Sequence, residues 1–191
     1  VKLFAEALRN ARELVKPCIS FAPMAKRAHA IRENELAYRI EAGETVVGVK
    51  VGGALDSPTS AEPTNVMIFG YLTDAMQLTD SIKTANYIYP RAEAEVAFKI
   101  SKEVSTEIQP SEVLDYVSHV ATAIEIFDYR YGQAQIYAND AIADNAGAAA
   151  FVYSHWVPAH EANLENLTAQ VFKNEDEIDK APLTAIRGNP W

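Results

Sequence analysis

The segment from Pro90 to Ile100, Pro-Arg-Ala-Glu-Ala-Glu-Val-Ala-Phe-Lys-Ile, constrains the fold more than any other part of the chain. Its alternation of residue types is typical of a β-strand, whose successive side chains point to opposite faces. One face would be apolar and carry Ala94, Val96, Phe98 and Ile100. Glu93 and Glu95 would point together from the other face, where neighbouring carboxylates repel unless a proton or cation lies between them. Such oxygen ligands suit Mg²⁺ or Mn²⁺, so the segment indicates a metal site, with a solvated sheet face as the alternative.

A third carboxylate, that of Glu125, lies within the apolar run Ala123-Ile124-Glu125-Ile126-Phe127, for which we predict a strand. An ionised carboxylate in such a run must be paired or bound to a metal to offset its loss of hydration. Asp128 and Arg130 follow directly, so an internal ion pair with arginine is the alternative to a metal ligand. Both interpretations stay open at this point.

Lys50 lies between valines in the run Thr45 to Val51, which predicts a strand ended by Gly52-Gly53. Lysine is seldom buried in a strand without a specific partner. It could bind a substrate carboxylate, or transfer protons if its pKa is lowered. The alternative is a lysine at a strand edge whose ammonium group reaches water.

The rest of the chain predicts a mixture of helices and strands. Apolar residues at helical spacing indicate helices over residues 1–16, 24–41 and 111–123. The last of these would carry Val113, Val117 and Val120 on one face and have Ser111 as its cap. Residues 56–64 are loop material, and further strands are expected at 67–72 and 167–172. We therefore expect one α+β domain, with a helical region at residues 1–45 and a mixed β region at residues 46–191.

Composition narrows the classes of function. The chain has 191 residues, 49% of them hydrophobic, and a net charge of −9. This charge argues against a nucleic-acid partner, which needs clustered Lys and Arg, and requires a local cation at any site for an anionic substrate. No apolar run is long enough to predict a membrane span. The single cysteine, Cys18, is expected to be structural and fits a reducing cytoplasm.

Five short blocks, in order along the chain, resemble the 2-keto-4-pentenoate hydratase/4-oxalocrotonate decarboxylase family. The first three are Gly48-Val49-Lys50-Val51-Gly52, similar to the family's Gly-x-Lys-x-Gly; Phe69-Gly70-Tyr71-Leu72-Thr73-Asp74-Ala75-Met76, similar to Tyr-Gly-x-Leu-x-Asp-x-Met; and Pro90-Arg91-Ala92-Glu93-Ala94-Glu95-Val96-Ala97-Phe98, similar to Pro-Arg-x-Glu-x-Glu-x-Ala-Phe. The last two are Ala123-Ile124-Glu125-Ile126-Phe127-Asp128-Tyr129-Arg130, similar to Ala-x-Glu-x-x-Asp-x-Arg, and Ile142-Ala143-Asp144-Asn145-Ala146, similar to Ala-Asp-Asn-Ala. The weaker similarity of the remaining chain extends to Arg187-Gly188-Asn189-Pro190.

The resemblance implies a fumarylacetoacetate-hydrolase-like fold, a mixed β-roll or barrel with flanking N-terminal helices. It also implies a Mg²⁺ (or Mn²⁺) ion held by Glu93, Glu95 and Glu125. Lys50 and Asp74 would be catalytic, and the residues expected to bind substrate are Leu72, Arg130, Asp144 and Asn145. The chain departs from the family at Gly147 and Ala148, where the family has serines, and it is expected to be C-terminally short because the family continues beyond the position of Trp191.

The expected reaction is hydration of a 2-hydroxy-2,4-dienoate to a 4-hydroxy-2-oxo acid, as follows meta-cleavage of aromatic rings. Decarboxylation of 4-oxalocrotonate (2-oxo-3-hexenedioate) is the close alternative, favoured by the tyrosine after Arg130. A third reading is an acylpyruvate C–C hydrolase, which would need a histidine base from among His29, His119, His155 and His160. A fourth is a non-catalytic partner subunit. The resemblance further implies a cytoplasmic homo-oligomer, or a hydratase–decarboxylase complex.

Overall fold

The computed structural model describes residues 25–55, 65–134, 136–186 and 188–191. Its contacts group the chain into two compact units, residues 1–93 with 125–152, and residues 94–124 with 153–191. The elements of the first unit include α2 (Ala25–Glu41), β1 (Val46–Leu55), β2 (Asn65–Thr73) and α4 (Ala138–Ala143). The predicted helix 1–16, Cys18 and the loop 56–64 lie outside the described residues. None of the helices within the described ranges is long and apolar enough to cross a membrane.

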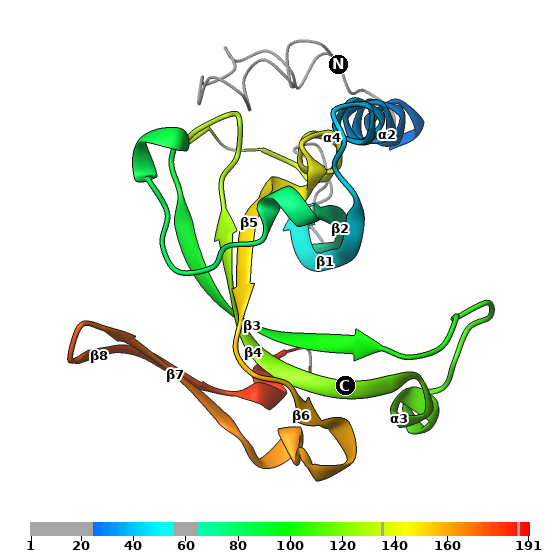
Figure 1. The fold of residues 1–191 in the computed structure, drawn as a ribbon, viewed down its shortest axis with the longest axis vertical. Coiled ribbons are helices and arrows are strands. Elements are labelled where there is room, and N and C mark those ends of the chain that lie inside the picture. Colours follow the sequence, from blue (N-terminus) through cyan, green and yellow to red (C-terminus); the bar gives the residue numbers. More distant parts are fainter. Residues whose placement is uncertain (1–24, 56–64, 135, 187) are drawn as a thin grey trace. The chain divides into compact units, whose positions relative to one another are not determined.

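Strands β1 and β2 form an antiparallel pair in which Lys50 lies opposite Gly70 (Figure 1). The prediction that Gly52-Gly53 ends the first strand is wrong, because these glycines pair with Ile68 and Met67 and the strand continues to Leu55. The alternation is also the reverse of a core strand, since the three valines at 47, 49 and 51 are 52%, 54% and 56% exposed. Lys50, on the opposite face, is half-buried.

Helix α2 confirms the predicted second helix. Its most buried residues are Ala28, Arg32 and Glu35, which are four and three positions apart and so share one side of the helix. The Arg32 guanidinium lies 3.9 Å from the centre of the Phe69 ring and donates a hydrogen bond to the Phe69 carbonyl oxygen at 3.0 Å. Charged groups therefore attach α2 to β2 alongside its apolar contacts.

The core of the first unit lies where α2, β2 and α4 meet. Its buried residues are Ala28, Ile68, Tyr131, Ala141, Ile142, Ala143 and Ala146. Helix α4 lies beside α2 in Figure 1, and it was not predicted from the sequence. Six residues with three alanines give a weak periodic signal, and tertiary burial rather than an amphipathic pattern accounts for this helix.

The second sheet is four-stranded, with β3 (Arg91–Ile100), β4 (Val117–Phe127) and β5 (Ala148–Tyr153) in that order and β6 (Val157–Pro158) beside β4. The helix predicted over 111–123 is wrong beyond Tyr116. The α-helix α3 covers only Val113–Tyr116, and from Val117 the chain is strand. The β-branched residues at helical spacing pair in a sheet instead, because sheet packing overrides local periodicity.

Three smaller findings concern the helical turn before α3, the C-terminal strands and the packing of β3. The helical turn before α3 begins at Pro110 rather than Ser111, and the Gln109 backbone N–H donates to the Glu112 carboxylate at 2.7 Å. Strand β7 (Thr168–Lys173) is followed by an unpredicted antiparallel partner, β8 (Asp176–Pro182). On β3, Val96 and Phe98 pack in the core with Val117, Val120 and Trp191, whereas Ile100 is 58% exposed.

Candidate active site

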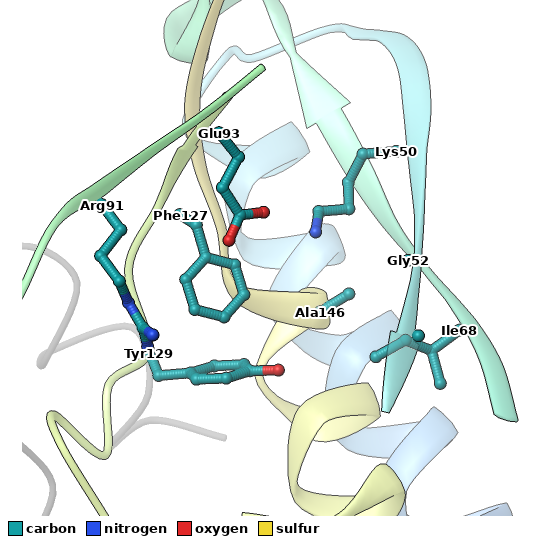
Figure 2. Close-up of a pocket in the computed structure, with 9 residues that line it drawn as sticks. Lys50, Gly52, Ile68, Arg91, Glu93, Phe127, Tyr129 and Ala146 are labelled. Atoms are coloured by element: carbon teal, nitrogen blue, oxygen red, sulfur yellow. The ribbon is translucent and has the colours of Figure 1, made fainter. Parts of the chain in front are cut away.

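A cavity of about 290 Å³ lies within the first unit, which is close to the lower limit for small-molecule pockets. Side chains from β1, β2, β3 and β4 and from the residues that follow β4 surround it (Figure 2). Its lining residues are Lys50, Gly52, Gly53, Ile68, Arg91, Glu93, Phe127, Tyr129 and Ala146. The size suits a short organic acid.

The structure brings together the carboxylates of Glu93, Glu95 and Glu125, which the sequence singles out. One oxygen from each lies within 4.8 Å of the others. Glu93 and Glu95 are two positions apart on β3 and therefore share a face, as the alternation predicts. Glu125 reaches the same place from β4 and is only 5% exposed. Three converging carboxylates repel one another, and a bound cation relieves that repulsion.

The donor set fits a hard divalent cation. Carboxylate oxygens are the preferred ligands of Mg²⁺ and Mn²⁺, and opposite ligands of Mg²⁺ are roughly 4 Å apart. Oxygens that already lie within 4.8 Å of one another need only small side-chain rotations to reach that spacing. Glu93 also lines the cavity, so an ion held by these residues would lie at its wall.

Lys50 forms an ion pair with Glu125, with 3.0 Å between Nζ and Oε1 and side chains that are 12% and 7% exposed. The contact is close but lacks hydrogen-bond alignment at Oε1. Figure 2 shows the Lys50 side chain pointing into the cavity toward Glu93. The structure thus gives Lys50 a buried acidic partner and a place in the cavity, rather than a strand edge in water.

Arg91, Phe127 and Tyr129 line the cavity, but the sequence reasoning gave them no role. The Arg91 guanidinium and the Lys50 ammonium lie 5.0 and 5.3 Å from the centre of the Phe127 ring. Figure 2 shows that ring between the two cations. The position of Arg91, two residues before Glu93 on a predicted strand, was the available signal, because it places both side chains on one face.

Asp128 fixes the chain just ahead of Arg91. Its buried carboxylate accepts hydrogen bonds from the backbone N–H groups of Ile88 at 2.8 Å and Tyr89 at 2.6 Å. These residues directly precede the Pro-Arg pair that opens β3. Asp128 therefore positions the cavity wall without lining the cavity.

Arg130 and Asp144 form a buried pair, with 2% and 1% of each residue exposed. The Arg130 guanidinium contacts the Asp144 carboxylate, whose Oδ2 also accepts the Arg130 backbone N–H at 2.8 Å. Burial raises the pKa of Asp144 to about 7, while the Arg130 charge and hydrogen bonds act in the opposite direction. Neither side chain belongs to the described lining of the cavity.

Asn145 connects the same turn to β2. Its side chain accepts the Tyr71 N–H at 2.7 Å and donates to the Tyr71 carbonyl at 2.9 Å. Asn145, Ala146 and Gly147 all have positive φ, at 51°, 54° and 71°. This conformation is strained for the two residues that are not glycine.

Glycine is required at two points around this turn. A Cβ at Gly147 would lie 2.5 Å from the Phe127 ring, and one at Gly70 would lie 2.2 Å from the Asn145 carbonyl oxygen. The close approach of Gly147 to the Phe127 ring fixes the position of that ring. The neighbouring Ala146 forms part of the cavity wall. The hydrogen bonds of Asn145 hold the strained turn in place.

The predicted catalytic residue Asp74 and the predicted substrate-binding residue Leu72 lie apart from the part of the cavity lining that the structure describes. Asp74 accepts hydrogen bonds at Oδ1 from the N–H groups of Thr45 and Ala75, both at 2.9 Å, and so closes the turn after β2. Leu72 is half-buried on β2. The structure therefore places Lys50 and Glu93 at the cavity and leaves the roles of Asp74 and Leu72 as predictions.

Removing the Arg130 side chain is expected to destabilise the first unit. Arg130→Met should lower the free energy of unfolding by about 3 kcal/mol, because Asp144 would stay buried without its cation. Chemical denaturation followed by circular dichroism measures the change. Arg27→Met, at an exposed arginine of α2, is the control and should change stability by less than about 0.5 kcal/mol. Equal stability of the two variants would contradict the proposed contribution of the pair.

Comparison with known proteins finds relatives that are named as hydratases and decarboxylases. The chain is 33% identical over 199 residues to a 2-hydroxyhexa-2,4-dienoate hydratase of Comamonas testosteroni, covering 97% of this chain and 73% of that protein. It is 31% identical over 167 residues to a 4-oxalocrotonate decarboxylase of a Pseudomonas species, covering 86% of this chain and 65% of that protein. No family model matches the chain.

Among solved structures, the fold matches that of 4-oxalocrotonate decarboxylase from Pseudomonas putida G7 complexed with magnesium and adipate. The TM-score is 0.81 at 22% sequence identity, over 99% of this chain and 74% of that one. The match supports an α+β fold of helices and sheets. Together with a hydratase relative at 33% identity that the chain matches over 73% of its length, these findings show that the chain belongs to the 2-keto-4-pentenoate hydratase/4-oxalocrotonate decarboxylase family of lyases.

Proposed function

We propose that this protein is a divalent-metal-dependent hydratase of short 2-hydroxy-2,4-dienoates, of the kind produced after meta-cleavage of aromatic rings. The dienol first ketonises: the proton of the C2 hydroxyl leaves and C5 gains a proton, giving a 2-oxo-3-enoate. Water then adds across C3 and C4, with oxygen bonding to C4 and hydrogen to C3. The product is a 4-hydroxy-2-oxo acid.

The observation that carries this proposal is the convergence of Glu93, Glu95 and Glu125, with one oxygen from each within 4.8 Å of the others. Glu93 lines the same cavity as Lys50. A divalent ion held there would supply Lewis-acid polarisation of the carboxylate and 2-oxo group of the substrate. It would also offset the negative charge of the three ligands and of a chain with net charge −9. Both candidate reactions, hydration and decarboxylation, involve a short acid with a carboxylate next to a 2-oxo group.

Lys50 and Arg91 would be the protein's own positive charges at the cavity, in addition to the ion. Lys50, held by Glu125, is placed to stabilise the developing oxyanion or to transfer a proton at C3 or C5. Arg91, which makes no ion pair with the described residues, would add positive charge on the other side of the Phe127 ring from Lys50. Phe127 lies between the two cations and presents a flat apolar surface to the conjugated chain.

For Arg130, Asp144 and Asn145 we propose a positioning role in place of direct substrate contact. Their buried bonds hold the turn that brings Ala146 to the cavity and fixes Phe127. Asp74 stays a predicted catalytic residue and Leu72 a predicted substrate-binding residue. The finer fold assignment, a fumarylacetoacetate-hydrolase-like roll or barrel, also stays a prediction, as do homo-oligomerisation, a hydratase–decarboxylase complex and cytoplasmic location.

Decarboxylation of 4-oxalocrotonate is the second candidate, because one relative with that name is 31% identical to the chain. The acylpyruvate hydrolase reading finds no support at the cavity, since the part of its lining that the structure describes contains no histidine. His160 is 78% exposed, and its nearest acidic partner is the neighbouring Glu161. A non-catalytic role would leave the buried Lys50–Glu125 pair without a chemical purpose.

An ultraviolet assay with and without Mg²⁺ tests the proposal. With Mg²⁺, 2-hydroxypenta-2,4-dienoate should lose its dienol absorbance and yield 4-hydroxy-2-oxopentanoate, and chelation with EDTA should abolish the reaction. The matched substrate is 2-oxohex-3-enedioate. Metal-dependent release of CO₂ from it, without turnover of the dienoate, would assign the chain to the decarboxylases. Inactivity on both substrates would favour the partner-subunit reading.

A further inference from the structure

Tyr129 is the cavity-lining residue for which the proposed reaction so far has no use. Its ring packs edge-on against Phe127, with ring centres 4.3 Å apart and an angle of 73° between the ring planes. Figure 2 shows the Tyr129 ring across the cavity from Lys50 and Glu93, with the hydroxyl directed toward the side where Ala146 and Ile68 lie. The contact with Phe127 restricts how the ring can turn, and therefore where the hydroxyl can be.

The Tyr129 hydroxyl is available for a ligand. Among the residues that the structure describes, none forms a hydrogen bond with it. Burial, followed by the negative charges of Asp144 and Glu93, raises the pKa of Tyr129. The phenol is thus neutral at physiological pH, so it adds no charge that would oppose an anionic substrate and can both donate and accept a hydrogen bond.

The cavity is charged at Lys50, Glu93 and Arg91 and apolar at Ile68, Ala146 and the Phe127 ring. Lys50 and Glu93 face each other on one side, where the proposed function places the carboxylate and the 2-oxo group. Away from them, Ile68, Ala146 and the Phe127 ring provide apolar surface for the chain of the substrate. A water molecule needs polar partners to occupy such a region. Tyr129 supplies the uncharged polar group there.

We propose that the Tyr129 hydroxyl binds and orients the water that adds to C4 of the substrate. This inference rests on the proposed hydratase function. The water would donate a hydrogen bond to the phenolic oxygen and direct a lone pair at C4. As the O–C4 bond forms, the electron pair of the C3–C4 double bond moves to C3, which takes up a proton. The water releases one proton to solvent as C3 takes one up, and the phenol keeps its own, so the net change is addition of H and OH.

The test separates ketonisation from hydration in the full chain. Tyr129→Phe removes one oxygen atom and keeps the ring that packs on Phe127. With 2-hydroxypenta-2,4-dienoate and Mg²⁺ in D₂O, deuterium at C5 reports ketonisation, and proton NMR of 4-hydroxy-2-oxopentanoate reports hydration. We expect hydration to slow by about tenfold, because the loss of one hydrogen bond in the transition state has an effect of that order. Ketonisation should change by less than about twofold. The intermediate 2-oxo-3-pentenoate should accumulate.

Tyr38→Phe is the matched control, because Tyr38 is 49% exposed on α2 and does not line the cavity. It should leave both rates unchanged. Equal slowing of both steps in Tyr129→Phe would show that the hydroxyl acts on substrate binding, and unchanged rates would show that the ring is only a wall; either result overturns the inference. If the wild-type chain fails to hydrate the dienoate at all, the proposed function fails first, and the role of Tyr129 fails with it.

Discussion

Glu125→Gln is expected to lower hydratase turnover by about 10³-fold at saturating substrate, because several kcal/mol of transition-state stabilisation depend on a correctly held ion. Glutamine keeps the volume of the side chain and removes the negative charge. Glu125 is 5% exposed and faces two further carboxylates. The substitution therefore removes a negative charge from a buried position within the proposed ligand cluster. Titration calorimetry with Mg²⁺ should show weaker binding in the same variant. Turnover is measured in parallel by the loss of dienol absorbance.

The matched control for this result is Glu103→Gln, which removes a charge from an exposed glutamate outside the cavity. It should bind Mg²⁺ and turn over substrate like the wild type. Glu93→Gln should behave like Glu125→Gln, since both carboxylates belong to the same cluster. Unchanged Mg²⁺ affinity in both cluster variants would place the ion elsewhere and contradict the proposed site.

Lys50→Ala is expected to lower turnover by about 10²-fold and to change Mg²⁺ affinity much less. The ammonium group lies at the cavity, 3.0 Å from Glu125 Oε1, but it is not a ligand. Removing it leaves the carboxylates free to hold the ion and takes away the positive charge that would act on the substrate. Rates at saturating Mg²⁺ and calorimetric Mg²⁺ titration together measure the two effects.

Lys50→Met controls for the loss of side-chain volume, because methionine fills much of the space of the lysine stem. We expect Lys50→Met to be as slow as Lys50→Ala, since both lack the ammonium group. Near-normal turnover in either variant would mean that Lys50 has a structural role only. A large loss of Mg²⁺ affinity would instead indicate that Lys50 organises the ligands.

The part of the site that the sequence predicted depends on alternation along strands. Glu93 and Glu95 are two positions apart on one strand, so their common direction follows from strand geometry alone. Glu125 was recognisable because a carboxylate in an apolar run needs a partner. The structure supplies both kinds of partner that had been considered, since Glu125 faces two carboxylates and is also paired with a cation, Lys50 rather than Arg130.

The remaining cavity could not be predicted in the same way, because its residues meet only through tertiary packing. Phe127 and Tyr129 are ordinary aromatic residues in the sequence, and the close approach of Gly147 gives the Phe127 ring its position. The αL turn at 145–147 depends on side-chain bonds from Asn145 to Tyr71, 74 positions earlier in the chain. No local pattern reports a contact over that distance.

The incorrect helix over 111–123 has a related cause. Val113, Val117 and Val120 fit a helical period, but the same residues fit a strand when neighbouring strands are available. Val117 and Val120 are buried in the core of the second unit as part of β4. The sheet partners, which the local sequence does not contain, decide between the two structures.

The most direct test of the central claim follows the oxygen atom of water into the product. The wild-type chain is incubated with 2-hydroxypenta-2,4-dienoate and Mg²⁺ in ¹⁸O-labelled water, and the product is reduced at C2 to prevent exchange there and analysed by mass spectrometry and ¹³C NMR. The account predicts 4-hydroxy-2-oxopentanoate with ¹⁸O at C4, formed only when the divalent ion is present. Unlabelled C4 oxygen, no product, or the same yield after removal of the metal would contradict it.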